Sequence, residues 1–101
     1  MILLISRLKA KSGYENTLIK GCMKLAEVVR EKERECLMYK PYASIESINE
    51  VIIIEKYLSE KALDYHMRTR HYIDAMGEFK NILEAPIDVQ RFYEEPVTNV
   101  Q

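Results

Sequence analysis

The chain of 101 residues lacks tryptophan and is poor in residues that break regular structure, with only 3 glycines and 3 prolines. It has no low-complexity tract and no internal repeat, which predicts a single domain over residues 1–101 without a linker. Its 2 cysteines, Cys22 and Cys36, form neither a CxxC pair nor a Cys/His ligand set. We therefore interpret both as buried, reduced thiols.

The sequence also lacks an excess of charge of one sign and a long apolar run. The 15 Lys and Arg residues balance 16 Asp and Glu residues, so the net charge of −1 provides no basic field for a nucleic acid. The apolar run from Met1 to Ile5 stops at Ser6, well short of the about 20 residues that a membrane-spanning helix needs. It also lacks a positive leader and a cleavage site. We expect a cytoplasmic protein with no nucleic-acid or membrane partner.

Hydrophobic periodicity gives the order of the elements. Strands are predicted over residues 2–10, 36–43, 51–57 and 87–94, and helices over 12–33, 59–70 and 71–83. This order is βαββαβ if the last two helical pieces count as one crossover, which predicts a ferredoxin-like α+β fold. Right-handed crossovers place the helices on one face of an antiparallel sheet. Pro41 directs its strand to an edge or a bulge.

The first helix carries the clearest amphipathic pattern. Ser12 and Glu15 fit a capping box, which predicts the helix start. An apolar stripe follows at the spacing of one helical face: Tyr14, Leu18, Cys22, Leu25 and Val29. The charged run over residues 30–35 is interpreted as a solvated helix end without a function.

Two of the predicted strands are apolar on both sides. Residues 2–5 and 51–54 consist of aliphatic side chains, and a strand of this kind needs cover on both faces of its sheet. The helices cover one face only. The simplest cover for the other face is a second copy of the chain, so we expect a homodimer packed sheet against sheet.

The candidate site lies in the stretch of residues 55–72, which contains both histidines. Glu55 and Tyr57 share one face of their strand, and His66 lies on one side of the following helix with Ala62 and Thr69. If both faces line the gap between helix and sheet, then Glu55, Tyr57 and His66 converge there as a candidate proton-transfer set. The alternative is a structural role, with Glu55 paired to Lys56 or Arg91 and His66 as a satisfied core histidine.

A metal site is not expected from the two histidines. His66 and His71 are five residues apart, which is roughly 140° around a continuous helix, and no HExxH motif is present. His71 reaches the same cavity only if the helix breaks near Thr69 and Arg70. Arg68 and Arg70 are candidates for attracting an anionic substrate, or are exposed helix arginines.

Taken together, the element order and several short motifs resemble the antibiotic biosynthesis monooxygenase (ABM) family of dimeric α+β barrels. The motifs run along nearly the whole chain: Lys11-Ser12-Gly13, Cys36-Leu37-x-Tyr39, Glu55-x-Tyr57, Ala62-Leu63, His66, Thr69-x-His71-Tyr72 and Arg91-x-Tyr93. Many members have tryptophan at the position of Tyr57. The haem-degrading branch is not expected, because Ser6 and Met76 replace its asparagine and histidine.

The resemblance implies a pocket in each subunit and an oxidoreductase of the monooxygenase type that needs no metal or other cofactor. The substrate would be a small quinol-like or phenolic compound. The catalytic residues would be His66, Glu55 and Tyr57, with either His66 or Glu55 as the base, and the substrate-binding residues would be His71, Tyr72, Ser6 and Arg91. One alternative is an isomerase of a small hydroxy-ketone, phosphorylated or not, because the stretch is also similar to a branch that isomerises a phosphorylated autoinducer-2 breakdown product. The other alternative is a non-catalytic dimeric small-molecule-binding protein.

Overall fold

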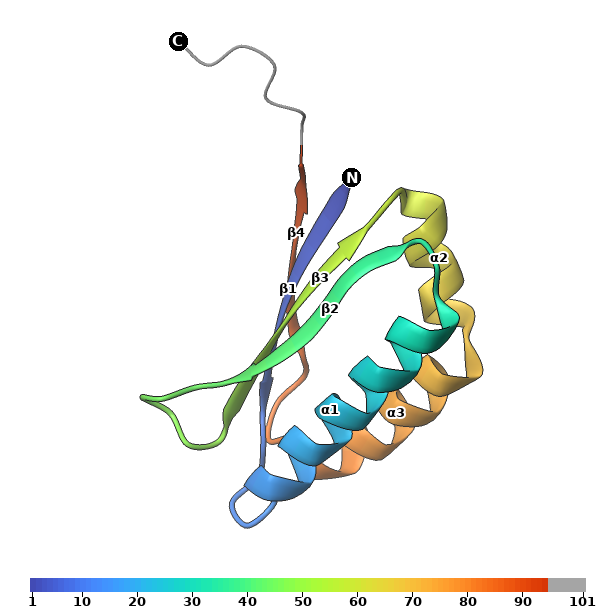
Figure 1. Ribbon diagram of the computed structural model, residues 1–101. Helices are drawn as coiled ribbons and strands as arrows, with labels where there is room; N and C mark the ends of the chain where they lie inside the picture. The colour runs from blue at the N-terminus through green and yellow to red at the C-terminus, as the bar shows by residue number, and fades with distance from the viewer. Residues whose placement is uncertain (95–101) are drawn as a thin grey trace, which may run out of the picture.

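A computed structural model describes residues 1–94, and it contains one antiparallel sheet with three helices on one of its faces (Figure 1). The elements are β1 (Ile2–Lys9), α1 (Glu15–Lys32), β2 (Cys36–Ala43), β3 (Glu50–Tyr57), α2 (Glu60–Arg68), α3 (Arg70–Ile82) and β4 (Asp88–Tyr93). The strand order is β2-β3-β1-β4, and every neighbouring pair is antiparallel. The predicted ferredoxin-like α+β fold is therefore confirmed, with its second crossover made of two helices.

The sheet places the two most apolar strands, β1 and β3, at its centre, with Ile5 opposite Ile54. Strand β2 is an edge strand, and its pairing register shifts between Cys36 and Met38. Pro41 is tolerated there because an edge strand leaves one row of N–H groups unpaired. The sequence thus predicted correctly that this strand lies at an edge.

Helix α1 begins later than its capping-box pattern predicts. It starts at Glu15, and Tyr14 at the N-cap position makes no side-chain capping bond. Before it the chain turns at Gly13, whose φ of 93° suits a residue without a Cβ, and the Gly13 N–H donates to the Glu15 carboxylate at 3.1 Å. Ser12 lies ahead of this turn and cannot reach the first helical N–H groups. The capping-box prediction is wrong.

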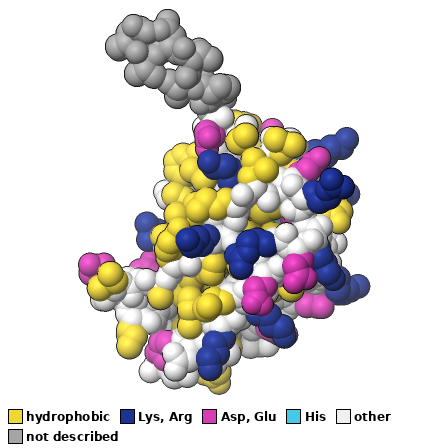
Figure 2. Space-filling model, viewed as in Figure 1, with side chains coloured by type: hydrophobic (Ala, Val, Ile, Leu, Met, Phe, Trp, Pro, Cys, Tyr) yellow, Lys and Arg dark blue, Asp and Glu magenta, His cyan; other side chains and the backbone are white. Residues whose placement is uncertain are grey.

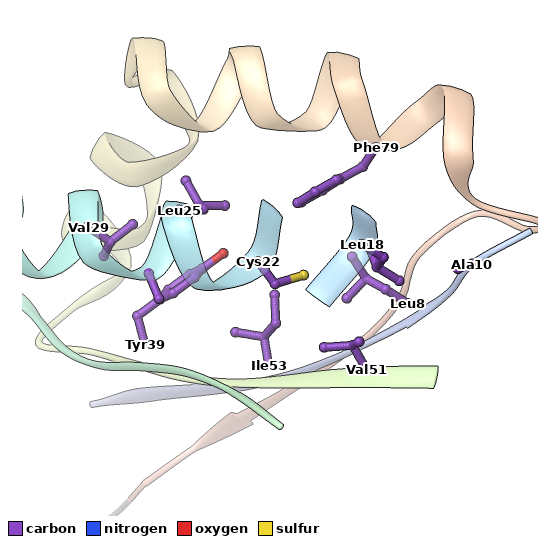
Figure 3. Close-up of a cluster of buried hydrophobic side chains, with 11 residues drawn as sticks. Leu8, Ala10, Leu18, Cys22, Leu25, Val29, Tyr39, Val51, Ile53 and Phe79 are labelled. Carbon is purple, nitrogen blue, oxygen red and sulfur yellow. The ribbon is translucent and has the colours of Figure 1, made fainter. Parts of the chain in front are cut away.

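The main core fills the space between α1, α3 and the sheet (Figure 3). In this view Leu18 and Cys22 of α1 lie above Val51 and Ile53 of β3, and Phe79 reaches in from α3. Four members of the predicted α1 stripe are buried, namely Leu18, Cys22, Leu25 and Val29, whereas Tyr14 is 45 % exposed. Burial raises the pKa of the Cys22 thiol to about 12, as expected for an inert core cysteine. Cys36 is only partly buried.

The helical crossover breaks at Thr69. Ser59 caps α2 by accepting a hydrogen bond from the Ala62 N–H at 3.2 Å. Thr69 has an extended backbone, with ψ at 151°, and its hydroxyl donates to the His66 carbonyl and accepts from the Tyr72 N–H. One threonine thus ends α2 and begins α3. As a result His66 lies in the last turn of α2, and His71 lies in the first turn of α3.

The sheet face opposite the helices carries aliphatic side chains in its two central strands. Because strand side chains alternate, the half-buried residues Leu3, Ile5, Ile52 and Ile54 point away from the helices. In Figure 2 charged side chains gather over the helices, and hydrophobic side chains are more frequent over the strands. Within residues 1–94 no helix is long and apolar enough to cross a membrane.

Candidate functional site

A cavity of about 290 Å³ lies between the sheet and the helices α2 and α3. Most of its wall is apolar, as is usual for a small-molecule pocket. Five of the seven residues that the sequence singles out line it, and they are Ser6, Glu55, His66, Tyr72 and Arg91. The other two, Tyr57 and His71, do not line the cavity but bond to carboxylates beside it.

Glu55 is the buried carboxylate of the sheet side, with 5 % exposure. It accepts hydrogen bonds from the Ser6 hydroxyl at 3.1 Å and from the Tyr57 hydroxyl at 2.7 Å. Burial raises the pKa of Glu55 above its usual range, although both hydrogen bonds oppose the rise, as does His66 whenever its ring is protonated. It pairs with neither Lys56, which bonds Glu94, nor Arg91. Glu55 is thus better suited to exchange a proton near neutral pH than an exposed glutamate.

Tyr57 is fully buried and lies behind Glu55 rather than on the cavity wall. Burial and the neighbouring Glu55 raise the pKa of its hydroxyl, so Tyr57 stays protonated and donates to the carboxylate. It holds Glu55 in place and does not itself meet a molecule in the cavity.

His66 closes the cavity from the side of α2, with 1 % exposure. Its ring lies among three tyrosine rings, with centroids 5.4 Å from Tyr39, 5.3 Å from Tyr57 and 4.8 Å from Tyr72. Its Nδ1 lies 2.8 Å from a carboxylate oxygen of Glu33. Its Nε2 is buried and has no hydrogen-bond partner within residues 1–94. His66 lines the cavity and Glu33 does not, and Nε2 is the ring nitrogen that Glu33 leaves unbonded.

Glu33 is the residue that the sequence interpretation missed. It follows the last turn of α1, its side chain is 2 % exposed, and both histidines contact its Oε2 atom. Burial alone would raise the pKa of Glu33, but the hydrogen bonds of His66 and His71 oppose it, a positive charge on either ring lowers it further, and the pKa lies below its usual range. One signal could have found it: Glu33 is four residues after Val29 and continues the buried stripe into the charged run.

His71 lies on the far side of Glu33 from the cavity. Its Nε2 is 2.5 Å from Glu33 Oε2, and its ring centroid is 6.4 Å from that of His66. The separation predicted for a continuous helix does not occur, because the helix breaks at Thr69, which was the alternative left open, and both rings contact one carboxylate. We call Glu33, His66 and His71 the His–Glu–His cluster.

The donor atoms of this cluster lie within 4.8 Å of one another, and carboxylate and imidazole are ligand types for zinc. The two histidine nitrogens are, however, 2.8 and 2.5 Å from the same Glu33 oxygen. Ligands around a tetrahedral zinc ion are about 3.3 Å apart, given bonds of about 2.05 Å. The observed spacing is that of two hydrogen bonds in which each histidine donates to the carboxylate.

The arginines on the helices do not reach the cavity. Arg70 is highly exposed and pairs loosely with Asp74 at 3.8 Å. Arg68 lines a separate surface groove beside Glu33. Among residues 1–94, Arg91 of β4 is the cationic side chain that lines the cavity.

The antiparallel sheet, the helices on one face and the cavity between them define a ferredoxin-like α+β protein with an internal cavity that Glu55 and His66 line. The family model described as "Antibiotic biosynthesis monooxygenase" matches residues 1–78, and the chain belongs to this family. YcnE of Bacillus subtilis (strain 168), which carries the name of a monooxygenase, is 26 % identical over 91 residues, covering 90 % of this chain and 95 % of that protein.

Solved structures confirm the fold. Rv0793 from Mycobacterium tuberculosis has a TM-score of 0.87 and 22 % identity, with 97 % of this chain and 98 % of that chain covered. PA3566 from Pseudomonas aeruginosa has a TM-score of 0.85 and 21 % identity, with 93 % of each chain covered. The family and the named relative together support a function of the monooxygenase type.

Proposed function

We propose that this chain is a monooxygenase that oxidises a small quinol-like or phenolic compound without a cofactor, and that His66 is its base. One observation carries the proposal. The buried Nε2 of His66 has no partner within residues 1–94, while Nδ1 of the same ring is held by Glu33. A buried polar atom is normally hydrogen-bonded, and in this proposal the substrate makes the bond that Nε2 lacks. A histidine oriented by a carboxylate is the usual arrangement of a general base.

The proposed chemistry begins with proton transfer. Nε2 of His66 takes a phenolic proton from the substrate, and the anion that remains is rich enough in electrons to react with oxygen. One atom of O2 enters the ring, and the other leaves as water after the ring has lost two further hydrogens. A quinol and O2 thus give a hydroxyquinone and water. Glu55, whose pKa is raised by burial, is placed to return or accept a proton on the sheet side of the same cavity.

The cavity wall supports an aromatic substrate. Its volume of about 290 Å³ lies at the lower end of the range for small-molecule pockets, which suits a compound of one or two rings. Leu4, Leu63 and Met67 provide apolar contact, and Tyr72 offers a ring edge-on to His66. In this proposal Ser6, Tyr72 and Arg91 contact the substrate, and Tyr57 acts through Glu55.

Arg91 favours a second candidate function. A cation on the wall of a cavity with two acid–base groups also suits an anionic hydroxy-ketone, which Glu55 and His66 would isomerise by moving a proton next to the carbonyl. The third candidate is a protein that binds a small metabolite in this cavity without turning it over.

Oxygen uptake with a panel of quinols, measured with and without a chelator, tests the proposal. We expect uptake that the chelator does not change. His66→Asn keeps a donor toward Glu33 but removes Nε2, and its kcat should fall by about 10²–10⁴. Tyr65→Phe is a matched control on the same helix, since Tyr65 is 56 % exposed.

Three results would contradict the monooxygenase. Absence of uptake on every quinol, together with proton exchange of a hydroxy-ketone in deuterated water, would favour the isomerase. Ligand binding without any turnover would favour the binding protein. A fully active His66→Asn variant would remove His66 from the role of base.

We also propose that the chain forms a homodimer through the outer sheet face. Leu3, Ile5, Ile52 and Ile54 present adjacent aliphatic side chains there, and such a face is a common interface. Light scattering should give twice the chain mass, and Ile54→Lys should lower it toward one chain. A wild-type mass of one chain would contradict this proposal.

A further inference from the structure

The His–Glu–His cluster has more histidines than a general base needs. His66 alone lines the cavity, yet His71 bonds the same oxygen of Glu33 from the other side. Each contact holds one proton, because two lone pairs cannot face each other at these distances. The lowered pKa of Glu33 favours the ionised carboxylate, and with Glu33 ionised both protons lie on the rings, on Nδ1 of His66 and on Nε2 of His71.

The charge of Glu33 requires a partner. Its side chain is 2 % exposed, and within residues 1–94 both of its ion-pair partners are histidines. A buried carboxylate is stabilised by the hydrogen bonds that it accepts and by a nearby positive charge. The lowered pKa of Glu33 favours its ionised form, and an imidazolium on one of the two rings would supply the charge that contacts it directly.

Burial decides between the two rings. The His66 side chain is 2 % exposed, whereas that of His71 is 15 % exposed and lines an outer groove with Asp74 and Glu78. An imidazolium loses more hydration at the buried position. Charge is therefore less costly on His71 than on His66.

We infer that His71 is a positioning residue, which carries the positive charge that compensates Glu33 and so leaves His66 neutral, with Nδ1 protonated and Nε2 free in the cavity. The inference rests on the proposed function in so far as a free Nε2 is what a base requires. Without the charge on His71, Glu33 would draw a second proton onto His66, and that proton would occupy the lone pair that takes the substrate proton.

Other charged and titratable groups surround the cluster. They come from every element packed against it: Lys24 and Lys32 of α1, Arg34 and Glu35 after it, Cys36 and Tyr39 of β2, Glu55 and Tyr57 of β3, Lys61 and Arg68 of α2, and Tyr72, Asp74 and Glu78 of α3. Asp74 and Glu78 favour a charge on His71, and Lys24 of the same groove opposes it. Glu55 acts in the opposite direction, because it favours a charge on His66.

The test is a pH titration of the two histidine rings by ¹⁵N nuclear magnetic resonance, without substrate. In the wild type we expect His71 to become an imidazolium at a higher pH than His66, and His66 to show a protonated Nδ1 at pH 7. If His66 is instead the charged ring at pH 7, the inference is overturned. This measurement needs no variant.

Two variants give shifts of opposite sign. His71→Gln removes the compensating charge, so the midpoint of proton uptake by His66 should rise by about one pH unit. Glu33→Gln removes the negative charge, so the same midpoint should fall by about one pH unit. Lost packing alone would move both midpoints in one direction, and that result would overturn the inference. Asp74→Asn is the control in the same groove, with a smaller shift because it makes no contact with Glu33.

The experiments can contradict the inference about His71 without contradicting the monooxygenase proposal, and the reverse also holds. The ring titrations decide the role of His71 whether or not a substrate is found. Oxygen uptake decides the monooxygenase. If both hold, the acidic limb of the pH profile of kcat/KM should move upward in His71→Gln by the shift seen for His66.

Discussion

The layer between the helices and the sheet has two different ends. One is packed with apolar side chains, and the other contains buried charged groups and a cavity. At one end Leu18, Cys22, Val51 and Phe79 pack in a cluster made almost wholly of hydrophobic side chains (Figure 3). At the other end Glu33, Glu55 and His66 are all buried at 5 % exposure or less, next to a cavity of about 290 Å³. Both ends draw on β1, β3 and α3, whereas α2 contributes only to the second. Burial of apolar area stabilises the first end, whereas buried charge and empty volume cost stability at the second.

This difference shows which part of the fold stabilises the chain and which part forms the candidate site. A site that keeps a nitrogen unpaired and two carboxylates out of water needs a rigid frame to hold it. The apolar end supplies this frame, because α1 reaches from Leu18 in the core to Glu33 in the site along one stripe. Substitutions at the two ends should therefore differ in kind: loss of stability at one, and changes in pH dependence at the other.

The largest effect is expected for Phe79→Ala at the apolar end. Phe79 is 2 % exposed, and loss of a buried phenyl ring lowers the free energy of unfolding by about 3–5 kcal/mol. Urea unfolding followed by circular dichroism would measure it. Ile73→Ala on the same helix is the control, because Ile73 is 48 % exposed and should change the value far less. Equal losses for both variants would mean that the apolar end is not the stabilising one.

A smaller effect of opposite sign at the two glutamates is expected in the pH dependence of stability. Burial raises the pKa of Glu55 in the folded chain, so the folded state binds more protons and stability falls as pH rises from the usual glutamate range to the raised value. The pKa of Glu33 is held low, so its contribution is full above the usual range and is lost as pH falls through the lowered value.

Each glutamate contributes a slope of at most about 1.4 kcal/mol per pH unit, the limit for one proton. Glu55→Gln should flatten the fall on the alkaline side, and Glu33→Gln should flatten the rise on the acidic side. Unfolding curves at a series of pH values from acid to neutral would show both. Glu27→Gln on the exposed side of α1 is the control. Slopes of the same sign for both variants would contradict the opposed roles of the two carboxylates.

The fold and the sheet side of the site could be predicted from the sequence. Because side chains alternate in direction along a strand, Glu55 and Tyr57 of residues 51–57 lie on one face, which is the inner face. The structure shows Tyr57 donating to Glu55. The helix side could not be predicted in full. A single threonine is only a weak helix-cap signal in a sequence. The break at Thr69, which brings His71 to Glu33, therefore depends on tertiary contacts. The roles of the site residues stay predictions.

Glu33 was overlooked for a physical reason. Six consecutive charged residues over positions 30–35 are typical of a solvated helix end. Only one of them occupies the buried stripe, and its burial is favourable because two histidines from 33 and 38 positions later donate to it. No local sequence pattern indicates a hydrogen-bond partner at so large a separation along the chain. The helical phase of Val29 and Glu33 was the one available indication.

The smallest effect compares the two glycines that lie inside helices. At Gly77 an added Cβ meets no atom within 4 Å, so Gly77→Ala should stabilise the chain by about 0.5–1 kcal/mol through helix propensity alone. At Gly21 an added Cβ would lie 2.8 Å from Cε1 of Phe79. That ring is buried in the apolar core and cannot withdraw to solvent, so overpacking costs about 1–3 kcal/mol and outweighs the same gain in propensity. Gly21→Ala should therefore have the lower urea midpoint of the two. If both variants gained equally, the apolar end would have room to relax, and its role as the rigid frame of the site would be wrong.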